Sequence, residues 1–301
     1  MNRPQCVCLF VSAITAAHFL LGARCVRAGS SVETISLAVV SAKPKHRIDE
    51  HRDFVNYLAR KLSSTSDVKG NVVIVPTALQ LAKLLNEKKT DFYIESPYPT
   101  YVINRESGAS VLLRRWKDGV SDYRGVLFTA KESRVTGLDD LLGKTVAFED
   151  AGSTSSYFMP KVFLLRKGFK LTERSSFDAQ VSAREIGYLF ADGSEKKLLN
   201  WVVSGKVAAG ALSNIDLDKR EAKTKLALVT LAETEMFPRH FLSVSKNLDA
   251  AMVSRLKEVL LNMHQDPEGQ KILRMSDNTT KFDPLPGGEE TIRRKFKQLF
   301  G

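Results

Sequence analysis

The sequence predicts an α/β protein of two lobes, each a mostly parallel sheet flanked by helices, with a chain that crosses twice between the lobes. Three observations predict this class. Strand-like and helix-like segments alternate along the chain, which is typical of parallel sheets covered by helices. An apolar N-terminal run predicts export and removal of residues 1–28. About 270 of the 301 residues then remain, more than one ordinary core holds.

The N-terminal segment, residues 1–28, is predicted to be a signal peptide. Arg3 precedes an apolar run from Val7 to Leu21, which is short for a transmembrane span. The residues before the expected cut, Val26-Arg27-Ala28, include the small side chains that signal peptidase prefers. We therefore expect secretion through the Sec pathway, cleavage near Ala28 and a periplasmic protein. Retention of the segment as an uncleaved anchor is the alternative.

Composition excludes several classes of function. The three cysteines, Cys6, Cys8 and Cys25, all lie in the segment expected to be removed, so no disulfide or thiolate chemistry is expected in the mature chain. Removal of residues 1–28 lowers the net charge of +11 by three arginines, to +8. The cations are spread along the chain without interleaved aromatic residues, so no nucleic-acid partner is expected. The positive charge serves either general solubility or the attraction of anions.

The first-lobe elements follow from apolar periodicity and β-branched runs. We expect strands and helices to alternate up to residue 107, followed by two strands around a turn at Asp118-Gly119. The strands are expected at 34–41, 71–77, 91–96, 109–116 and 123–130, and the helices at 51–62, 78–89 and 98–107.

A second lobe is expected to begin after residue 131, where the segment GLDDLLGK (137–144) leads into a strand. Further strands are expected at 145–150, near 176–180, at 207–213 and at 226–233, the last as a return strand to the first lobe. Helices are expected through Phe163 and around 198–205. After a strand at 241–246, Asp249 is a good N-cap for an amphipathic helix, and a final helix covers 289–300. The lobes are therefore residues 29–131 with 236–301, and residues 132–235, with crossings near 130 and 235.

The clearest local pattern is the run Ser153-Thr154-Ser155, which follows a strand and Gly152 and opens a helix. Free N–H groups, the helix dipole and the hydroxyls at such a start can hold an oxyanion without a formal positive charge. The alternative is ordinary helix capping, since Ser and Thr are common N-cap residues.

The segment LDDLLGKTVAFEDAGSTSSYFMP (138–160) resembles the periplasmic binding proteins of phosphonate and phosphite ABC transporters. Three other segments are similar to that family: TDFYIESPYPTYV (90–102), SGKVAAGALSN (204–214) and MFPRHFLSVSKNL (236–248). The resemblance implies a periplasmic-binding-protein-like fold, a monomer that binds a small anionic ligand between its lobes, and an ABC permease as the membrane partner. A sensor receptor or kinase in place of the permease is the alternative.

Further candidate ligand residues follow from their places at strand ends and in the loops that resemble the family. They are Ser41, Glu95, Ser96, Tyr98, Ser213 and Asn214, with Tyr123, Tyr157 and Arg239 as additional candidates. Two departures from the family bear on the ligand: Ser156 stands where the family has glycine, and Glu95 stands where a neutral residue is expected. A carboxylate beside a dianion is unfavourable, so Glu95 indicates a ligand that carries a proton or an amine. The alternative is an ion pair of Glu95 with Arg114 or Arg115.

An enzyme is not expected. The sequence has no Gly-x-Ser-x-Gly, no phosphate-binding Gly-Lys-Ser/Thr loop and no His-Glu-x-x-His, and its five histidines show no metal-ligand spacing. No cofactor or metal is therefore expected.

Overall fold

A computed structural model of the protein describes residues 34–41, 44–63, 69–224 and 227–301. These residues all belong to one compact unit of the chain, Val32–Gly301. The expected signal peptide, with Cys6, Cys8, Cys25 and the cleavage position after Ala28, lies outside the described residues. No helix in the described ranges is long and apolar enough to cross a membrane.

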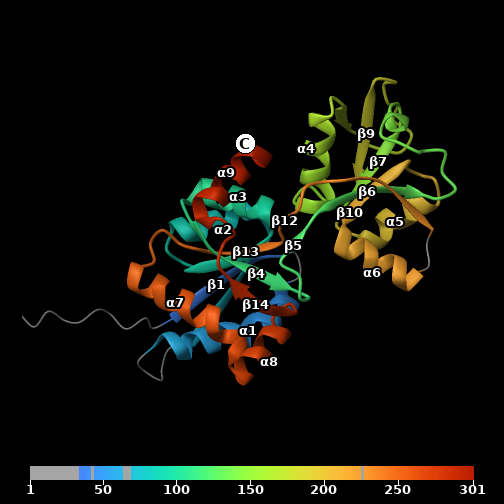
Figure 1. The fold of residues 1–301 in the computed structure, drawn as a ribbon. Coiled ribbons are helices and arrows are strands. Elements are labelled where there is room, and N and C mark those ends of the chain that lie inside the picture. The colour runs from blue at the N-terminus through green and yellow to red at the C-terminus, as the bar shows by residue number, and fades with distance from the viewer. Residues whose placement is uncertain (1–33, 42–43, 64–68, 225–226) are drawn as a thin grey trace, which may run out of the picture. The chain divides into compact units, whose positions relative to one another are not determined.

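The first sheet has six strands in the order β14-β4-β13-β3-β1-β2 (Figure 1). Four of them run in one direction, whereas β13 lies antiparallel between β3 and β4, and β14 is antiparallel to β4. The sheet is therefore mixed. Its strands are β1 (Thr34–Val40), β2 (Lys69–Val75), β3 (Phe92–Glu95), β4 (Ser110–Lys117), β13 (His240–Val244) and β14 (Thr279–Asp283).

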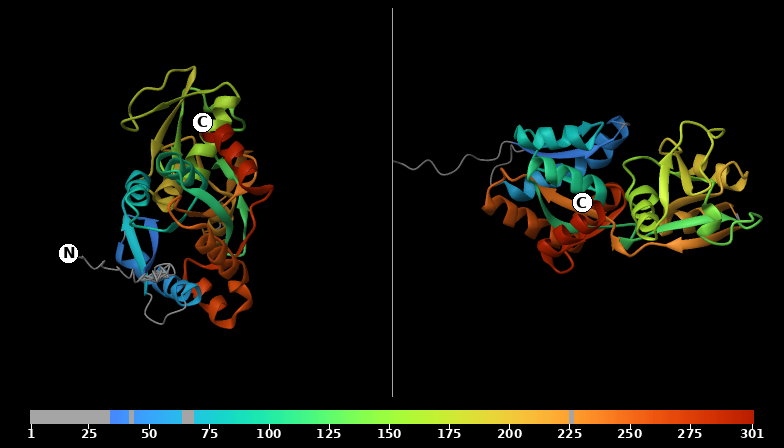
Figure 2. Two further views of the ribbon diagram at one scale, coloured as in Figure 1. Left: turned by 90° about the vertical axis from the view of Figure 1, so that its left-hand side faces the viewer. Right: turned by 90° about the horizontal axis from the view of Figure 1, so that it is seen from above.

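Helices cover both faces of this sheet. Alternate residues of β1 point to opposite faces, as in any strand. Leu37 and Val39 pack with residues of α1, α7 and α8, whereas Ala38 packs with residues of α2 and α3. The C-terminal helix α9, red in Figures 1 and 2, lies beside α3. The helices are α1 (Pro44–Leu62), α2 (Ala78–Asn86), α3 (Pro97–Ser107), α7 (Ala250–Asn262), α8 (Pro267–Met275) and α9 (Gly288–Phe300), with a 3-10 turn η3 (Met263–Gln265) before α8.

The second sheet has the order β11-β6-β10-β7-β9-β8. Only β6 runs against the other strands, since it pairs antiparallel with β10 and β11. Val146 and Phe148 of β7 pack toward α4, and Ala147 packs toward α5 and α6. The elements are β6 (Gly125–Ala130), η1 (Asp139–Leu141), β7 (Thr145–Phe148), η2 (Thr154–Phe158), α4 (Met159–Arg166), β8 (Lys170–Glu173), β9 (Glu185–Phe190), α5 (Glu195–Val203), β10 (Ala209–Ser213), α6 (Asn214–Thr224) and β11 (Leu228–Glu233).

Two passages join the sheets, and they pair with each other through β5 (Asp122–Tyr123) and β12 (Phe237–Pro238). The sequence pattern predicts the first crossing near residue 130, with residues up to 131 in the first lobe. In the structure β6 belongs to the second sheet, so this crossing comes earlier, between Lys117 and Gly125. The return falls after β11, close to the expected residue 235. The segment expected as a return strand to the first lobe contains β11 (Leu228–Glu233), which pairs with β6, so this strand belongs to the second sheet and precedes the return.

Local signals explain most elements. The Asp249 side chain accepts a hydrogen bond from Met252 N–H and caps α7, as the sequence predicts. The strand expected near 176–180 is wrong, because those residues lie in bends between β8 and β9. Phe177, which favours a strand there, packs edge-to-face on Trp201 instead. The sequence pattern predicts neither the helices α6 and α8 nor the strands β8, β9 and β14.

Candidate functional site

The helix start after β7 is built by four consecutive hydroxyl residues. Ser153 is the N-cap, and its Oγ accepts a hydrogen bond from Ser156 N–H at 3.2 Å. The five-residue π-helical turn η2 follows and continues directly into α4. Ser153 therefore caps the helix, in agreement with the capping alternative, while the positive end of the helix dipole remains at this loop.

Ser156 connects the loop to the second sheet through its side-chain hydroxyl. Its hydroxyl donates to the backbone oxygen of Ala211 in β10 at 2.5 Å and accepts from Glu149 N–H at 3.0 Å. The side chain is fully buried, so both bonds are shielded from water. This residue positions the loop from within and is not a ligand group.

A close approach of backbone also fixes the loop. A Cβ atom added to Gly125 at the start of β6 would lie 2.5 Å from the backbone oxygen of Ser155 and 2.9 Å from the Pro160 ring. Only glycine leaves this space open. The sequence pattern did not single out Gly125, since nothing local to β6 reveals what packs on it.

A second helix start meets the first at Thr154. Ser96 is the N-cap of α3, and its side chain makes no capping bond. Its Oγ lies 3.1 Å from Thr154 Oγ1, and Tyr98 N–H donates to the same Thr154 oxygen at 3.0 Å. Thr154 is buried. Two N-termini, one from each sheet, thus converge on one hydroxyl, and an oxyanion oxygen beside it would be within reach of the same donors.

Tyr123 contributes a hydroxyl group near Thr154 and Ser155. It lies on β5 in the first passage, its side chain is 5% exposed, and its hydroxyl has no well-formed hydrogen bond within the described part of the chain. Burial raises the pKa of Tyr123, while the nearby Thr154 and Ser155 hydroxyls and the charge of Arg239 lower it. A buried hydroxyl without a partner costs about 1–3 kcal/mol. A ligand oxygen beside Thr154 and Ser155 would remove that cost.

Glu95 ends β3, directly before Ser96. Its Oε1 accepts a hydrogen bond from Val40 N–H at 3.1 Å. Burial raises the pKa of Glu95 to about 7, although the Val40 bond and the charges of Arg47 and Arg115 act in the opposite direction. The alternative, an ion pair of Glu95 with Arg114 or Arg115, is not formed.

Those two arginines are engaged elsewhere. Arg114 pairs with Asp122 and Asp283 at 2.7 and 2.6 Å, and Arg115 pairs with Asp277 at 2.9 Å. Neither arginine is therefore the ion-pair partner of Glu95. Glu95 is thus a carboxyl group with a raised pKa directly before the start of α3, which makes it a candidate site residue.

Glu149 is a site residue that the sequence pattern did not reveal. It follows β7, and its Oε2 accepts a hydrogen bond from Ser153 Oγ at 3.3 Å. Burial raises the pKa of Glu149 to about 7, and the charges of Asp150, Glu195 and Asp216 raise it further. Its place at the carboxyl end of a strand, beside the hydroxyl run, was the available signal. The candidate site thus has a carboxyl group on each side.

Three predicted ligand residues, Ser213, Asn214 and Arg239, form hydrogen bonds within the protein. Ser213 Oγ accepts from Asp216 N–H at 3.0 Å and donates to the Asp216 carboxylate, which is ordinary turn chemistry. Asn214 Oδ1 accepts from Arg124 N–H at 3.0 Å. Arg239 donates to the Lys117 backbone oxygen and to Asp118, at 3.1 and 3.2 Å.

Aromatic packing accounts for two more predicted residues. The Tyr98 ring stacks on Phe158 and meets Phe300 edge-on, so only its backbone N–H faces Thr154. The Tyr157 hydroxyl accepts from Lys161 at 2.7 Å and lies 3.3 Å from the Tyr188 hydroxyl, inside the core of the second sheet. Ser41 follows β1, and its N–H donates to Val75 O at 2.9 Å. The structure therefore brings together Ser96, Tyr98 N–H, Tyr123, Thr154 and Ser155, flanked by Glu95, Ser153 and Glu149.

Comparison with known proteins identifies one family. A family model described as ABC transporter, phosphonate, periplasmic substrate-binding protein matches residues 37–286. The phosphate-import protein PhnD of Mycolicibacterium smegmatis is 26% identical over 192 residues, which are 62% of this chain and 57% of that protein. The match therefore spans little more than half the length of that relative.

Solved structures share the fold. XAC2383 from Xanthomonas citri, solved bound to ATP, is 26% identical with a TM-score of 0.80, over 89% of this chain and 95% of that chain. The same protein has been solved bound to a chloride ion. PhnD1 from Prochlorococcus marinus, in complex with methylphosphonate, is 18% identical with a TM-score of 0.61, over 89% of this chain and 100% of that chain. The last likeness shows the fold alone.

Proposed function

Because the chain belongs to the periplasmic substrate-binding proteins of phosphonate ABC transporters, we propose that it captures a small oxyanion of the phosphonate, phosphite or phosphate type between two lobes. The lobes that we infer are residues 34–117 with 240–301, and residues 125–233, which follow the membership of the two large sheets. This division replaces the boundary at residue 131.

The meeting of two helix starts at Thr154 carries the proposal. Tyr98 N–H already donates to an oxygen there, and Ser96 and Thr154 offer hydroxyls 3.1 Å apart. An incoming oxyanion oxygen would accept from Tyr98 N–H and would turn the Thr154 hydroxyl into a donor. Bonds of this kind to a charged group contribute about 1.5–3 kcal/mol each. Two further neutral donors are the hydroxyls of Ser155 and Tyr123, and the Tyr123 hydroxyl has no well-formed hydrogen bond among the described residues.

In this proposal, the carboxyl groups of Glu95 and Glu149 select which ionisation state of the ligand is bound. Near neutral pH, Glu95 and Glu149 are partly protonated, because their pKa values are raised to about 7. A protonated carboxyl can donate to an oxyanion, and an ionised one can accept from a ligand proton or amine. A fully ionised dianion is therefore disfavoured relative to a ligand that retains a proton or has an amine.

We place the protein in the periplasm, secreted through the Sec pathway, where it delivers its ligand to an ABC permease as a monomer without cofactor or metal. Among the described residues, no three His, Cys, Asp or Glu side chains group as metal ligands. The family is one of binding proteins. The alternative, a sensor that reports the same ligand to a membrane receptor, uses the same site, so stimulation of a reconstituted permease ATPase by the loaded protein separates the two roles.

A nucleotide is the second candidate ligand. The observation that favours it is the Xanthomonas citri protein bound to ATP, which is 26% identical with a TM-score of 0.80. A terminal phosphate of ATP offers the same oxygens to Thr154 and Tyr98 N–H as a free oxyanion does.

Titration calorimetry tests the proposal. The panel consists of phosphate, phosphite, methylphosphonate, aminoethylphosphonate and ATP, with sulfate as an oxyanion that has no proton near neutral pH. We expect one phosphorus-containing ligand to bind with micromolar affinity or better and sulfate to bind far more weakly, since the carboxyl groups disfavour it. Absence of binding across the panel, or equal binding of sulfate, contradicts the proposal.

A further inference from the structure

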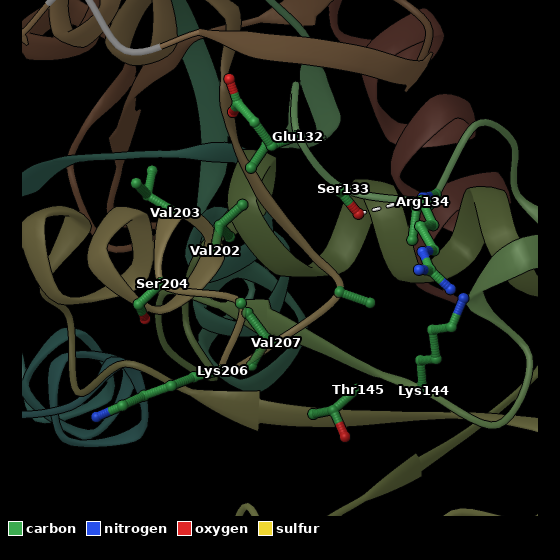
Figure 3. Close-up of a pocket in the computed structure, with 14 residues that line it drawn as sticks. Glu132, Ser133, Arg134, Lys144, Thr145, Val202, Val203, Ser204, Lys206 and Val207 are labelled. Atoms are coloured by element: carbon green, nitrogen blue, oxygen red, sulfur yellow. Dashed lines mark hydrogen bonds between the residues drawn. The ribbon is translucent and has the colours of Figure 1, made fainter.

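A cavity of about 490 Å³ opens on the second sheet, away from the candidate ligand site (Figure 3). Thr145, the first residue of β7, lines it, whereas the Ser153 loop follows the last residue of the same strand. The two places therefore lie at opposite ends of β7. A partner in this cavity would leave the ligand site free.

Arg134 and Lys144 bring two cations to this cavity. The guanidinium of Arg134 and the ammonium of Lys144 point toward one another (Figure 3). Within the described ranges, neither forms an ion pair; Lys144 donates to the backbone oxygen of Asp140 at 2.6 Å. The Asp140 carboxylate accepts from Thr136 N–H at 2.8 Å and from its hydroxyl at 2.9 Å. Glu132, the single carboxylate among the lining residues, points away from both cations (Figure 3).

The cavity continues into a neighbouring groove with exposed apolar side chains. The two share Val203, Ser204 and Lys206 as lining residues. Val203 is 45% exposed, and Phe177, which packs edge-to-face on Trp201, is 43% exposed. Lys197 lies 4.8 Å above the Trp201 ring, and Lys206 lies 5.9 Å from the Phe177 ring. Cations around exposed apolar and indole groups are typical of surfaces that lie in the headgroup region of a bilayer.

We propose that this basic–apolar face, defined by Arg134, Lys144, Lys196, Lys197, Trp201, Val203, Lys206 and Phe177, docks on a membrane surface that contains anionic phospholipids. Charge complementarity favours this occupant, because the face has five cations, while the carboxylates beside them are Glu132, the Lys197 partner Asp192, and Asp140 next to Lys144. Lipid phosphates supply direct ion-pair partners for Arg134 and Lys144. The apolar boundary of the headgroups accepts Val203, Phe177 and the Trp201 ring.

Vesicle binding of the full chain tests the proposal. The sequence has two tryptophans, so Trp116→Phe leaves Trp201 as the single indole reporter. We expect its emission to shift to shorter wavelength with phosphatidylcholine vesicles that contain phosphatidylglycerol, and not with phosphatidylcholine alone. Each cation near an anionic surface contributes about fivefold to partitioning. The double variant Arg134→Glu/Lys144→Glu should therefore bind at least about 25-fold more weakly.

A matched control has the same change in net charge. Lys257→Glu/Lys271→Glu reverses two exposed cations of α7 and α8, which pack on the first sheet. We expect this variant to bind within a few-fold of the parent protein. Arg134→Gln/Lys144→Gln repeats the test if the reversal variant fails to fold, as monitored by circular dichroism.

Three outcomes would overturn the proposal. Equal losses in the two reversal variants would show that vesicles respond only to the net charge of the protein. Sedimentation with anionic vesicles while Trp201 emission stays unshifted would place the contact on another face. Binding to polyglutamate, without binding to anionic vesicles, would identify an acidic protein as the partner of this face.

Discussion

Replacement of Thr154 by valine removes one hydroxyl from the point where η2 and α3 begin, and it keeps the size of the side chain. The lost oxygen accepts from Tyr98 N–H at 3.0 Å and lies 3.1 Å from Ser96 Oγ. If the hydroxyl binds a charged ligand, its removal costs about 1.5–3 kcal/mol, which is a 10- to 150-fold rise in the dissociation constant. The same substitution leaves Tyr98 N–H without an acceptor, so the free protein is also destabilised by about 1–3 kcal/mol.

Threonine to serine separates these two effects. Thr154→Ser keeps the hydroxyl and loses one buried methyl group, so we expect about 1 kcal/mol of lost stability and an affinity within threefold of the parent protein. Calorimetry with the tightest ligand of the panel gives the dissociation constant, and circular dichroism gives the melting temperature. If Thr154→Val melts earlier but binds with unchanged affinity, the hydroxyl is only structural, and the proposed anchor is wrong.

Four further predictions concern the surroundings of the loop. Ser156→Ala should lower the free energy of unfolding by about 1–3 kcal/mol, because it removes the hydroxyl that accepts from Glu149 N–H and donates to Ala211 O. An unchanged melting temperature would contradict this prediction. Gly125→Ala should weaken ligand binding at least tenfold, because the added Cβ would lie 2.5 Å from Ser155 O; calorimetry should show the loss in a protein that still folds. Glu149→Gln should flatten the dependence of affinity on pH between 6 and 8, relative to the parent protein. Glu95→Gln should raise the free energy of unfolding at pH 8 more than at pH 5. The Glu95 carboxyl keeps its proton up to about pH 7 in the folded protein but loses it near pH 4.5 in the unfolded chain, so the stability of the parent protein falls between these pH values. Equal effects of the substitution at pH 5 and pH 8 would contradict a raised pKa of Glu95.

The sequence reveals those features that depend on neighbours along the chain. The Asp249 cap, the strand at β1 and the hydroxyl run at Ser153 are all readable from a few consecutive residues. The sheet to which a strand belongs is not local. The segment that forms β6 is an apolar run like the others, and only its pairing with β10 and β11, roughly a hundred residues later, places it in the second sheet. The first crossing was therefore expected too late.

The same limit applies to the candidate site. Thr154 and Tyr98 are 56 positions apart, and their contact depends on how two loops from different sheets meet. The pKa of Glu149 is raised partly by Glu195 and Asp216, which come from later helices. Tyr123 has no distinctive neighbours in sequence, and its unused hydroxyl is visible only once its burial is known. Residue type and position at a strand end can suggest individual site residues, but they cannot show that these residues meet at one site.

The candidate site contains groups that attract a negative ligand and carboxyl groups that repel one, so it favours a partly protonated ligand over a dianion. Helix starts and hydroxyls favour negative charge at Thr154, whereas Glu95 and Glu149 oppose it once they ionise. A group with a pKa near 7 is about nine-tenths protonated at pH 6 and about one-tenth at pH 8. The affinity for an oxyanion should therefore fall over this range by more than the titration of the ligand itself explains. Because the ligand titrates identically with every variant, the difference between the parent protein and Glu149→Gln isolates the carboxyl. A parallel fall in both proteins would assign the pH dependence to the ligand or to Glu95, and Glu149 would then have no part in selecting the ionisation state of the ligand.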